Sequence, residues 1–310
     1  MHRSFWILLI TITFLWSVNI GCMAKTINEN AGTRGGQILK IGIGANAVGM
    51  GESYVAAADN IYSVYWNPAG LHIIDRSQLG FMHNEWFEDI RHEFLGYVQP
   101  IGNMGTLAGS VSYISMGELD KTDESGKELS KFHPYDILFG LSYGTGLGKS
   151  AAFGLSIEFL QEKIDEEKAQ VVAFDIGGLY NLSDKGPILG VNLQNLGTKM
   201  KFVEESFQIP LNLKVGVAQR LMDNTLTVAV DANFPSDNDI NMGLGIEYRI
   251  MGMIDLRGGY RYTLGGNDLG AFSGLRTGIG IGFGRYKIDY AFVPYGELGQ
   301  AHRISLLASF

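Results

Sequence analysis

The feature of this sequence that most constrains its fold is an alternation of apolar and polar residues that recurs along most of the chain. The segment INMGLGIEYR, residues 240–249, has apolar side chains at every second position, with glycine, asparagine and charged residues between them. The last segment, RISLLASF, alternates in the same way, apart from Leu307, and ends on Phe310. Successive side chains of a β-strand point to opposite faces, so this pattern predicts strands with one apolar and one polar face.

About fourteen such segments follow one another, an even number as in bacterial membrane barrels. They begin near residues 77, 91, 104, 134, 150, 169, 187, 210, 224, 240, 253, 270, 284 and 301. Their connections alternate between tight turns such as GTGLGK and RIMG and longer polar stretches such as ELDKTDESGKELSKFH and QEKIDEEK. Outer-membrane barrels have short turns at one end and longer loops at the other. The sequence therefore predicts an all-β membrane protein, an antiparallel outer-membrane β-barrel of about fourteen strands.

The polar faces indicate which side of the wall meets lipid. They carry glycine, serine, asparagine and charges of both signs, and charged residues make up only 18% of the chain, against a usual ~25%. A closed barrel with lipid outside and a polar lumen fits this composition and satisfies every backbone group. Outer-membrane lipid is thus an expected partner, whereas a net charge of −8 gives no basic stripe for nucleic acid. The charges predicted to face the lumen include Glu158, Asp175, Lys214, Asp231, Glu247, Arg257, Arg276 and Lys287. An ion-pair network that anchors a plug and a selective charged pore are both open for them.

Residues 1–24 are predicted to be a signal peptide. His2 and Arg3 precede the apolar run FWILLITITFLW, which is shorter than the ~20 residues that span a bilayer. Small residues, Cys22 and Ala24, follow at the positions expected before a cleavage site. Lipoprotein processing at Cys22 is the alternative. Export of this kind predicts the outer membrane of a Gram-negative-type bacterium.

Residues 25–76 are predicted to form a plug, and residues 77–310 the barrel. The N-terminal part is rich in small residues and lacks strand alternation, while a barrel of about fourteen strands has a lumen too wide for its own side chains. One strand, RTGIGIGFG, places Gly278, Gly280 and Gly282 on its inward face, which we expect to receive the plug. A merely bent strand is the alternative. No cofactor is expected, because Gly42-Ile43-Gly44 is followed by Ala47 where a dinucleotide fingerprint needs glycine.

Three stretches make a family resemblance specific. The segment QILKIGIGANAVGMGESYVAAADNIYSVYWNPAGL resembles the N-terminal signature of the PorV/PorQ family, relatives of the FadL-type barrels. PYDILFGLSYG and NLGTKMKFVEESFQIPLNLKVGV are also similar to that family. The resemblance implies a fourteen-stranded outer-membrane barrel with an N-terminal plug, whose motif is matched by Trp66, Asn67, Pro68, Ala69 and Gly70. It implies a part in type IX-like protein secretion or transport; the alternative is a FadL-like channel for small hydrophobic compounds. Phe310 resembles the terminal aromatic through which the barrel assembly machinery recognises such proteins.

No enzyme is predicted. His83, Glu85, Glu88, Asp89 and His92 gather near the first outer loop, where a metal or catalytic site is conceivable, but we interpret them as solvated loop residues. The expected partners are secreted cargo proteins or hydrophobic small molecules. For protein docking, the loop KMKFVEESFQI offers Met200, Phe202, Val203 and Phe207. The alternative is that these side chains only fold the loop over the barrel mouth.

Overall fold

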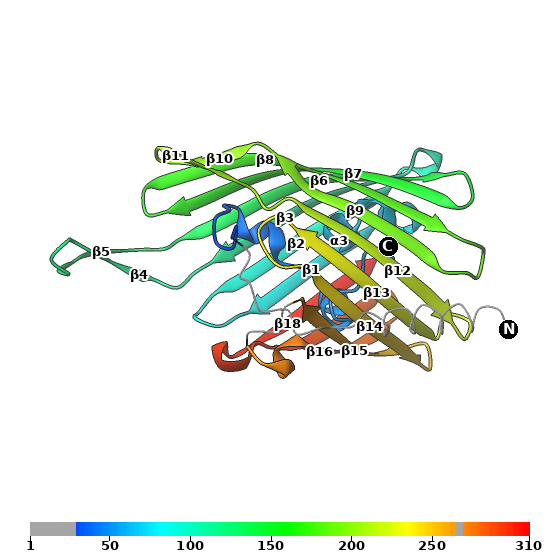
Figure 1. Ribbon diagram of the computed structural model, residues 1–310. Coiled ribbons are helices and arrows are strands. Elements are labelled where there is room, and N and C mark those ends of the chain that lie inside the picture. Colours follow the sequence, from blue (N-terminus) through cyan, green and yellow to red (C-terminus); the bar gives the residue numbers. More distant parts are fainter. Residues whose placement is uncertain (1–28, 265–268) are drawn as a thin grey trace.

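A closed antiparallel barrel dominates the computed structural model, which describes residues 29–264 and 269–310 (Figure 1). The predicted signal peptide lies outside the described residues. The wall closes where the first strand pairs with the last, with Gln78 opposite Ser309. Fourteen strands form the wall: β1 (Gln78–Glu85), β2 (Arg91–Pro100), β3 (Thr106–Ser115), β6 (Tyr135–Leu147), β7 (Ala151–Ile164), β8 (Glu167–Asn181), β9 (Ile188–Gly197), β12 (Asn212–Leu221), β13 (Leu226–Pro235), β14 (Asn241–Ile250), β15 (Ile254–Thr263), β16 (Leu275–Phe283), β17 (Tyr286–Pro294) and β18 (Gln300–Ser309).

The predicted barrel is confirmed, and the alternation has the expected meaning. In β14, Leu244 and Ile246 are exposed on the outer face, whereas Gly243 and Gly245 are buried inside. The same division holds along β16, where Ile279 and Ile281 are exposed. Leucine, isoleucine, phenylalanine and tyrosine therefore cover the outside, as a wall that faces lipid requires.

The connections sort by length, with two differences from prediction. Two polar loops each contain a small hairpin, β4 (Leu119–Thr122) with β5 (Glu128–Phe132) and β10 (Lys199–Phe202) with β11 (Glu205–Gln208). The stretch QEKIDEEK, expected as a loop, belongs mostly to β7 and β8, which have 14 and 15 residues and turn at Asp165. A bilayer needs only ~9–11 residues per strand, so this hairpin is long enough to continue beyond the hydrocarbon layer.

The N-terminal segment 37–74 lies inside the barrel (Figure 1). Gly35 lies against Met200 of β10, at the end of the barrel that carries the longer loops. The last helical turn of the segment lies against Gly144 and Gly154, near the end with the short turns. The chain thus passes through the lumen from the long-loop end to the short-turn end before β1 begins. Its elements are η1 (Gln37–Lys40), α2 (Ala45–Gly49), α3 (Ser63–Trp66) and η2 (Pro68–Ile73).

The remaining short helices lie in connections between wall strands. They are η3 (Gly102–Met104), η4 (Ala271–Gly274) and η5 (Gly296–Leu298). Among the described residues, no helix is both long enough and apolar enough to span a membrane.

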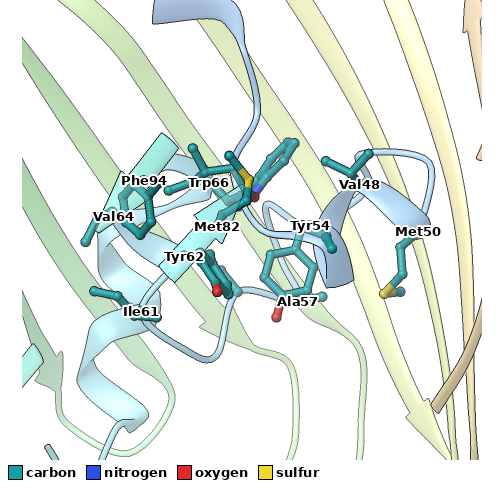
Figure 2. Packing of buried hydrophobic residues seen from close by; sticks show 14 of the residues in the cluster. Val48, Met50, Tyr54, Ala57, Ile61, Tyr62, Val64, Trp66, Met82 and Phe94 are labelled. Atoms are coloured by element: carbon teal, nitrogen blue, oxygen red, sulfur yellow. The ribbon is translucent and has the colours of Figure 1, made fainter. Parts of the chain in front are cut away.

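The main hydrophobic core lies between the N-terminal segment and the inner wall (Figure 2). Ile61, Tyr62 and Trp66 of the segment pack in one cluster with Met82 of β1 and Phe94 of β2. Each such side chain contributes ~1.5–3 kcal/mol when it is fully buried. The segment is therefore held by apolar burial as well as by polar contacts.

A second cluster closes the long-loop end. Met200 and Ile209, from the loop that contains β10 and β11, pack with Ile38 and Leu39 of η1 and with Leu160 of β7. Met200 is 1% exposed, whereas Val203 at the hairpin tip is 60% exposed. Much of the predicted docking loop is therefore folded over the mouth, the alternative that the sequence had left open, and its tip remains accessible.

Candidate functional site

Hydrogen bonds join the Trp66–Gly70 stretch to other parts of the N-terminal segment and to β8 of the wall. The Trp66 indole Nε1 donates to the Ile43 carbonyl at 2.8 Å. The Asn67 amide Nδ2 donates to the carbonyls of Val55, at 2.9 Å, and Gly178 of β8, at 3.1 Å. Its Oδ1 accepts from the Ala69 backbone N–H and so caps η2, which starts at Pro68. One buried side chain thus fixes the end of the segment and joins it to the wall.

Inward glycines of the wall leave room for the backbone of this stretch. A Cβ on Gly154 of β7 would lie 2.2 Å from the backbone N of Ala69, and one on Gly177 of β8 would lie 2.2 Å from Asn67 Oδ1. Gly70 itself lies against Ala58, where an added Cβ would be 2.5 Å from the Ala58 carbonyl oxygen. At Gly154 and Gly70 no larger residue fits without a backbone shift, and at Gly177 the side chains of Asn67 and Pro68 would have to move. The N-P-A stretch and the wall are therefore complementary in shape.

The same close approach of wall glycines to the backbone of the segment recurs around the lumen. A Cβ on Gly245 or Gly259 would come within 2.2 Å of the backbone of Met50 or Gly51, and one on Gly190 would meet Val55 at 2.7 Å. These glycines were not singled out from the sequence. Their positions on the polar face of alternating strands, as in FGLSIEF, are the signal that could have identified them.

The predicted glycine row on β16 behaves differently along its length. Gly278 lies against Gly49 of α2, with a Cβ-to-Cα distance of 3.3 Å. At Gly280 the nearest atoms belong to Asp289 and Arg257, and at Gly282 the neighbour is the Met253 carbonyl oxygen at 3.7 Å. The prediction that the row receives the plug is therefore wrong for Gly280 and Gly282. At Gly280 the free space is taken by an ion-pair cluster that the alternation could not locate.

Gly278 and Gly282, which lie on the same face of β16, allow a matched test. Gly278→Val should destabilise the protein by ~1–3 kcal/mol, because the added carbons press on the α2 backbone, and should expose the segment to protease. Gly282→Val should leave both properties near wild type, since its Cβ finds only an ordinary contact. Chemical denaturation in detergent and limited proteolysis measure the two effects. Equal behaviour of the two variants would contradict the contact between β16 and α2.

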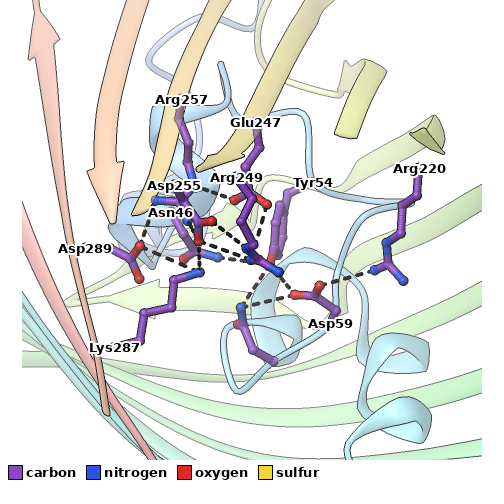
Figure 3. A network of polar contacts seen from close by, with 11 residues as sticks. Asn46, Tyr54, Asp59, Arg220, Glu247, Arg249, Asp255, Arg257, Lys287 and Asp289 are labelled. Atoms are coloured by element: carbon purple, nitrogen blue, oxygen red, sulfur yellow. Dashed lines mark hydrogen bonds and ion pairs between the residues drawn. The ribbon is translucent and has the colours of Figure 1, made fainter. Parts of the chain in front are cut away.

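Arg257 is the centre of the ion-pair cluster in the lumen (Figure 3). Its side chain is fully buried, and its guanidinium pairs with Glu247 at 2.7 Å, Asp289 at 2.7 Å and Asp255 at 3.1 Å. Arg249 and Lys287 also pair with Asp255. All these residues lie on β14, β15 and β17, so the cluster cross-links the wall.

A different set of contacts joins the segment to the wall. The Asp231 carboxylate of β13 accepts from the backbone N–H groups of Tyr54 and Val55, at 2.7 and 2.8 Å. Asp59 pairs with Arg220 of β12 at 3.2 Å. Lys40 pairs with Asp237 at 2.8 Å. The predicted network is thus divided into wall-to-wall and segment-to-wall parts.

Glu52 binds two arginines from the wall. Its carboxylate lies 2.6 Å from Arg261 and 3.8 Å from Arg276. Glu52 therefore ties the segment to β15 and β16.

Two further predicted lumen charges, Glu158 and Asp175, make no ion pair with the arginines in the described part of the chain. Asp175 is buried and accepts from the backbone N–H of Asn195 at 2.8 Å. Its register neighbours place it on β8 opposite Ser156 of β7, two residues before Glu158. The predicted charges are therefore distributed around the lumen, and the structure does not gather them in one site.

The histidines and acids near the first outer loop are separated. His83 of β1 contacts Glu93 at 2.6 Å, whereas His92 of β2 points inward and lies 3.1 Å from the Ser112 hydroxyl. His83, Glu85 and His92 are strand residues, so their description as loop residues was wrong. Within residues 29–264 and 269–310, no group of three or more His, Cys, Asp or Glu side chains is arranged to hold a metal ion.

Two hollows complete the picture. One, of about 50 Å³, lies in the lumen at the long-loop end and is lined by Lys214, Tyr65 and Trp66 among others. The other, of about 640 Å³, lies on the outer face of the wall between β2 and β8. It is lined mainly by exposed apolar side chains such as Leu107, Leu141 and Phe174.

Comparisons with known proteins give one family and one fold. The family model described as type IX secretion system protein PorV matches residues 24–236. No curated protein matches the chain. Among solved structures, the monoaromatic hydrocarbon channel CymD has a TM-score of 0.62 at 14% identity, over 87% of this chain and 98% of that one. The Pseudomonas putida toluene transporter TodX has a TM-score of 0.61 at 14% identity, over 86% and 97%. A FadL homologue of Pseudomonas aeruginosa has a TM-score of 0.55 at 12% identity, over 85% and 97%. At these identities the likeness is one of fold alone.

Proposed function

This chain belongs to the family of the type IX secretion system protein PorV, and from that membership we propose that it is a non-enzymatic outer-membrane barrel that takes part in protein secretion. The family match includes the N-terminal segment and the wall as far as β13. It ends before β14, so the fold rather than the family model describes the last strands. In this proposal the expected signal peptide delivers the chain, and Phe310 is read by the assembly machinery.

The observation that carries the proposal further is the filled lumen. Residues 37–74 run through the barrel and are packed against its inner wall by apolar contacts, hydrogen bonds and ion pairs. A polypeptide needs an open passage, and the lumen cavity of about 50 Å³ offers none. The barrel therefore acts in secretion as a docking component, and cargo crosses the membrane elsewhere.

The surface suited to docking is the long-loop end. Exposed apolar side chains occur at both ends of the barrel, and a contiguous patch of them, not a single residue, marks an interaction site. At the long-loop end they stand on several connections. The most exposed are Leu129 of β5, Val203 of the β10–β11 turn, Phe272 of η4 and Leu298 of η5. They come from loops far apart in sequence that lie at the same end of the barrel, and in this proposal they contact the protein partner.

A paired substitution tests this surface. In cells that depend on this chain for secretion, Val203→Asp with Phe272→Asp should lower secreted protein and its co-purification with the barrel by about tenfold or more. The control is Met222→Asp with Met251→Asp at the short-turn end, where both residues are exposed. Val203, Met222 and Met251 share positive φ angles of 52–53°, a region that Asp tolerates better than most residues.

The measurement is quantitative proteomics of the culture medium and of the affinity-purified barrel. Both double variants should show wild-type heat-modifiable mobility, which separates docking from folding. Equal secretion by the test and control variants would remove the long-loop end as the docking surface.

A channel for small hydrophobic compounds is the second candidate. The outer hollow of about 640 Å³ is within the size range of ligand pockets, and the fold is that of hydrocarbon channels. Solvent extraction of the barrel purified from native membranes distinguishes the candidates. A stoichiometric apolar molecule, without co-purified secreted protein, would favour the channel.

A further inference from the structure

Lys214 of β12 is a buried cation that makes no ion pair within 4.0 Å among the described residues, and the carboxylates of Glu52, Asp175 and Asp231 act on it only from farther away. The residue is 5% exposed, and its ammonium nitrogen lies 4.4 Å from the centre of the Tyr65 ring and 4.6 Å from that of Trp66. Among the described residues, no carboxylate oxygen lies within 4.0 Å of it, and it makes no hydrogen bond. Two aromatic faces compensate part of the desolvation of an ammonium group. An acceptor would still be needed to satisfy its N–H groups.

The other cations that line the small lumen cavity each have a carboxylate partner. Lys40 lies 2.8 Å from Asp237, and Arg261 lies 2.6 Å from Glu52. Among the ionisable residues that line this cavity, Lys214 is therefore the one that makes no ion pair. A single unpaired ammonium group suits a monoanion better than a phosphate monoester, whose charge is about −1.5 to −2.

The cavity also supplies an amide for a second contact. Asn212 lines it at the start of β12, and its Oδ1 has no hydrogen-bond partner in the described part of the chain. Its Nδ2 makes only a long contact of 3.4 Å with Gln194. Rotation of the amide by 180° would exchange its oxygen and nitrogen, so that N–H groups stand where the unpaired Oδ1 lies. An ammonium and an amide together match the two oxygens of a carboxylate.

From this geometry we propose that the cavity binds one carboxylate group, held by Lys214 Nζ and the Asn212 amide. About 50 Å³ exceeds the ~30 Å³ of one water and is far below the ~300 Å³ of a pocket for a whole ligand. The site therefore takes the acidic end of a molecule. The rest extends past Lys40 and Arg261, whose side chains are 29% and 35% exposed at the long-loop end. A small organic acid and the terminal carboxylate of a polypeptide share this chemistry.

Calorimetric titration of the purified full barrel in detergent tests the site. The probes are sodium acetate, N-acetyl-trialanine with a free carboxylate, the same peptide with a terminal amide, and sodium chloride. We expect the peptide acid to bind, acetate to compete with it, and the amide to bind at least about tenfold more weakly, the usual effect of losing a charge-assisted hydrogen bond. Lys214→Met should weaken the peptide acid by a similar factor. Lys168→Met, an exposed lysine of β8, is the matched control and should change nothing.

The outcomes distinguish the two sources of the carboxylate and also test the proposal itself. Tighter binding of the peptide acid than of acetate assigns a polypeptide terminus, and equal binding assigns a small acid. The proposal is overturned if no probe binds, if acid and amide peptides bind equally, if chloride equals acetate, or if Lys214→Met binds like wild type. Should Lys214→Met fail to fold, the acid-to-amide comparison on the unaltered protein decides. None of these results depends on secretion, so the proposed function can fail independently.

Discussion

Replacing Leu244 with arginine is expected to block assembly of the barrel in membranes. Leu244 stands at the middle of β14 and is 46% exposed on the outer face. A charge on the lipid face costs ~2–4 kcal/mol at the midplane of a bilayer and little near its edges. The fraction of protein that shows heat-modifiable mobility after reconstitution measures the loss. We expect most of the variant to remain unassembled.

The control for Leu244→Arg is Met251→Arg in the turn of the same hairpin. Met251 is 90% exposed and joins β14 to β15 at the short-turn end. The same charge there should assemble almost as well as wild type, because it reaches the interface. If both variants assembled equally, the outer face of β14 would not be the lipid-facing surface.

The wall was predictable because its evidence is local. Each strand carries its own alternation, and the order of pairing follows the order in sequence, with β1 meeting β18 at closure. Even His92 follows this rule, since it shares the inward face of β2 with Phe94 and Val98. The polar residues around it are typical of a loop, whereas the alternation assigns His92 to the strand.

The path of the N-terminal segment was not predictable to the same degree. Its residues have no period, and its contacts join positions far apart in the sequence, such as Gly154 with Ala69 and Gly245 with Met50. Alternation places Gly245 inside, where serine would be expected to be far milder than arginine at the neighbouring Leu244. The structure places the Met50 carbonyl oxygen 2.2 Å from its Cβ position. An inward glycine is visible in the sequence, but the backbone that requires it is not.

The Lys214 site depends on the same non-local information. The lysine was predicted to face the lumen, yet Tyr65 and Trp66 reach it only because the segment crosses the barrel at that level. Cancellation of the neighbouring charges likewise depends on pairs such as Arg261 with Glu52. Periodicity can therefore assign a charge to the lumen, whereas tertiary contacts decide whether that charge has a partner.

Gly154→Val should release the N-terminal segment from a barrel that still inserts. The new side chain would overlap the Pro68–Ala69 peptide, whose backbone atoms lie 2.2 Å from the Cβ position. Overpacking costs ~1–3 kcal/mol when side chains can adjust, and here a backbone fixed by Asn67 must move instead. The outer face and the strand pairing are untouched, so the wall should close as before. We expect cleavage near Asn67 by protease and a conductance in planar bilayers that approaches that of a chain lacking residues 41–71.

The control is Gly258→Val on β15, where a Cβ meets no atom within 4 Å. It adds the same side chain to a strand glycine and should keep the wild-type conductance and protection. The comparison separates the effect of the contact between Gly154 and the segment from the general cost of replacing glycine in a strand. If Gly154→Val kept the wild-type conductance and protection, the contact at the N-P-A stretch would not be what holds the segment in the lumen. If Gly154→Val conducted like the deletion, one added side chain on the wall would be sufficient to open the barrel. The reason would be that the segment and the wall glycines fit together only backbone to backbone.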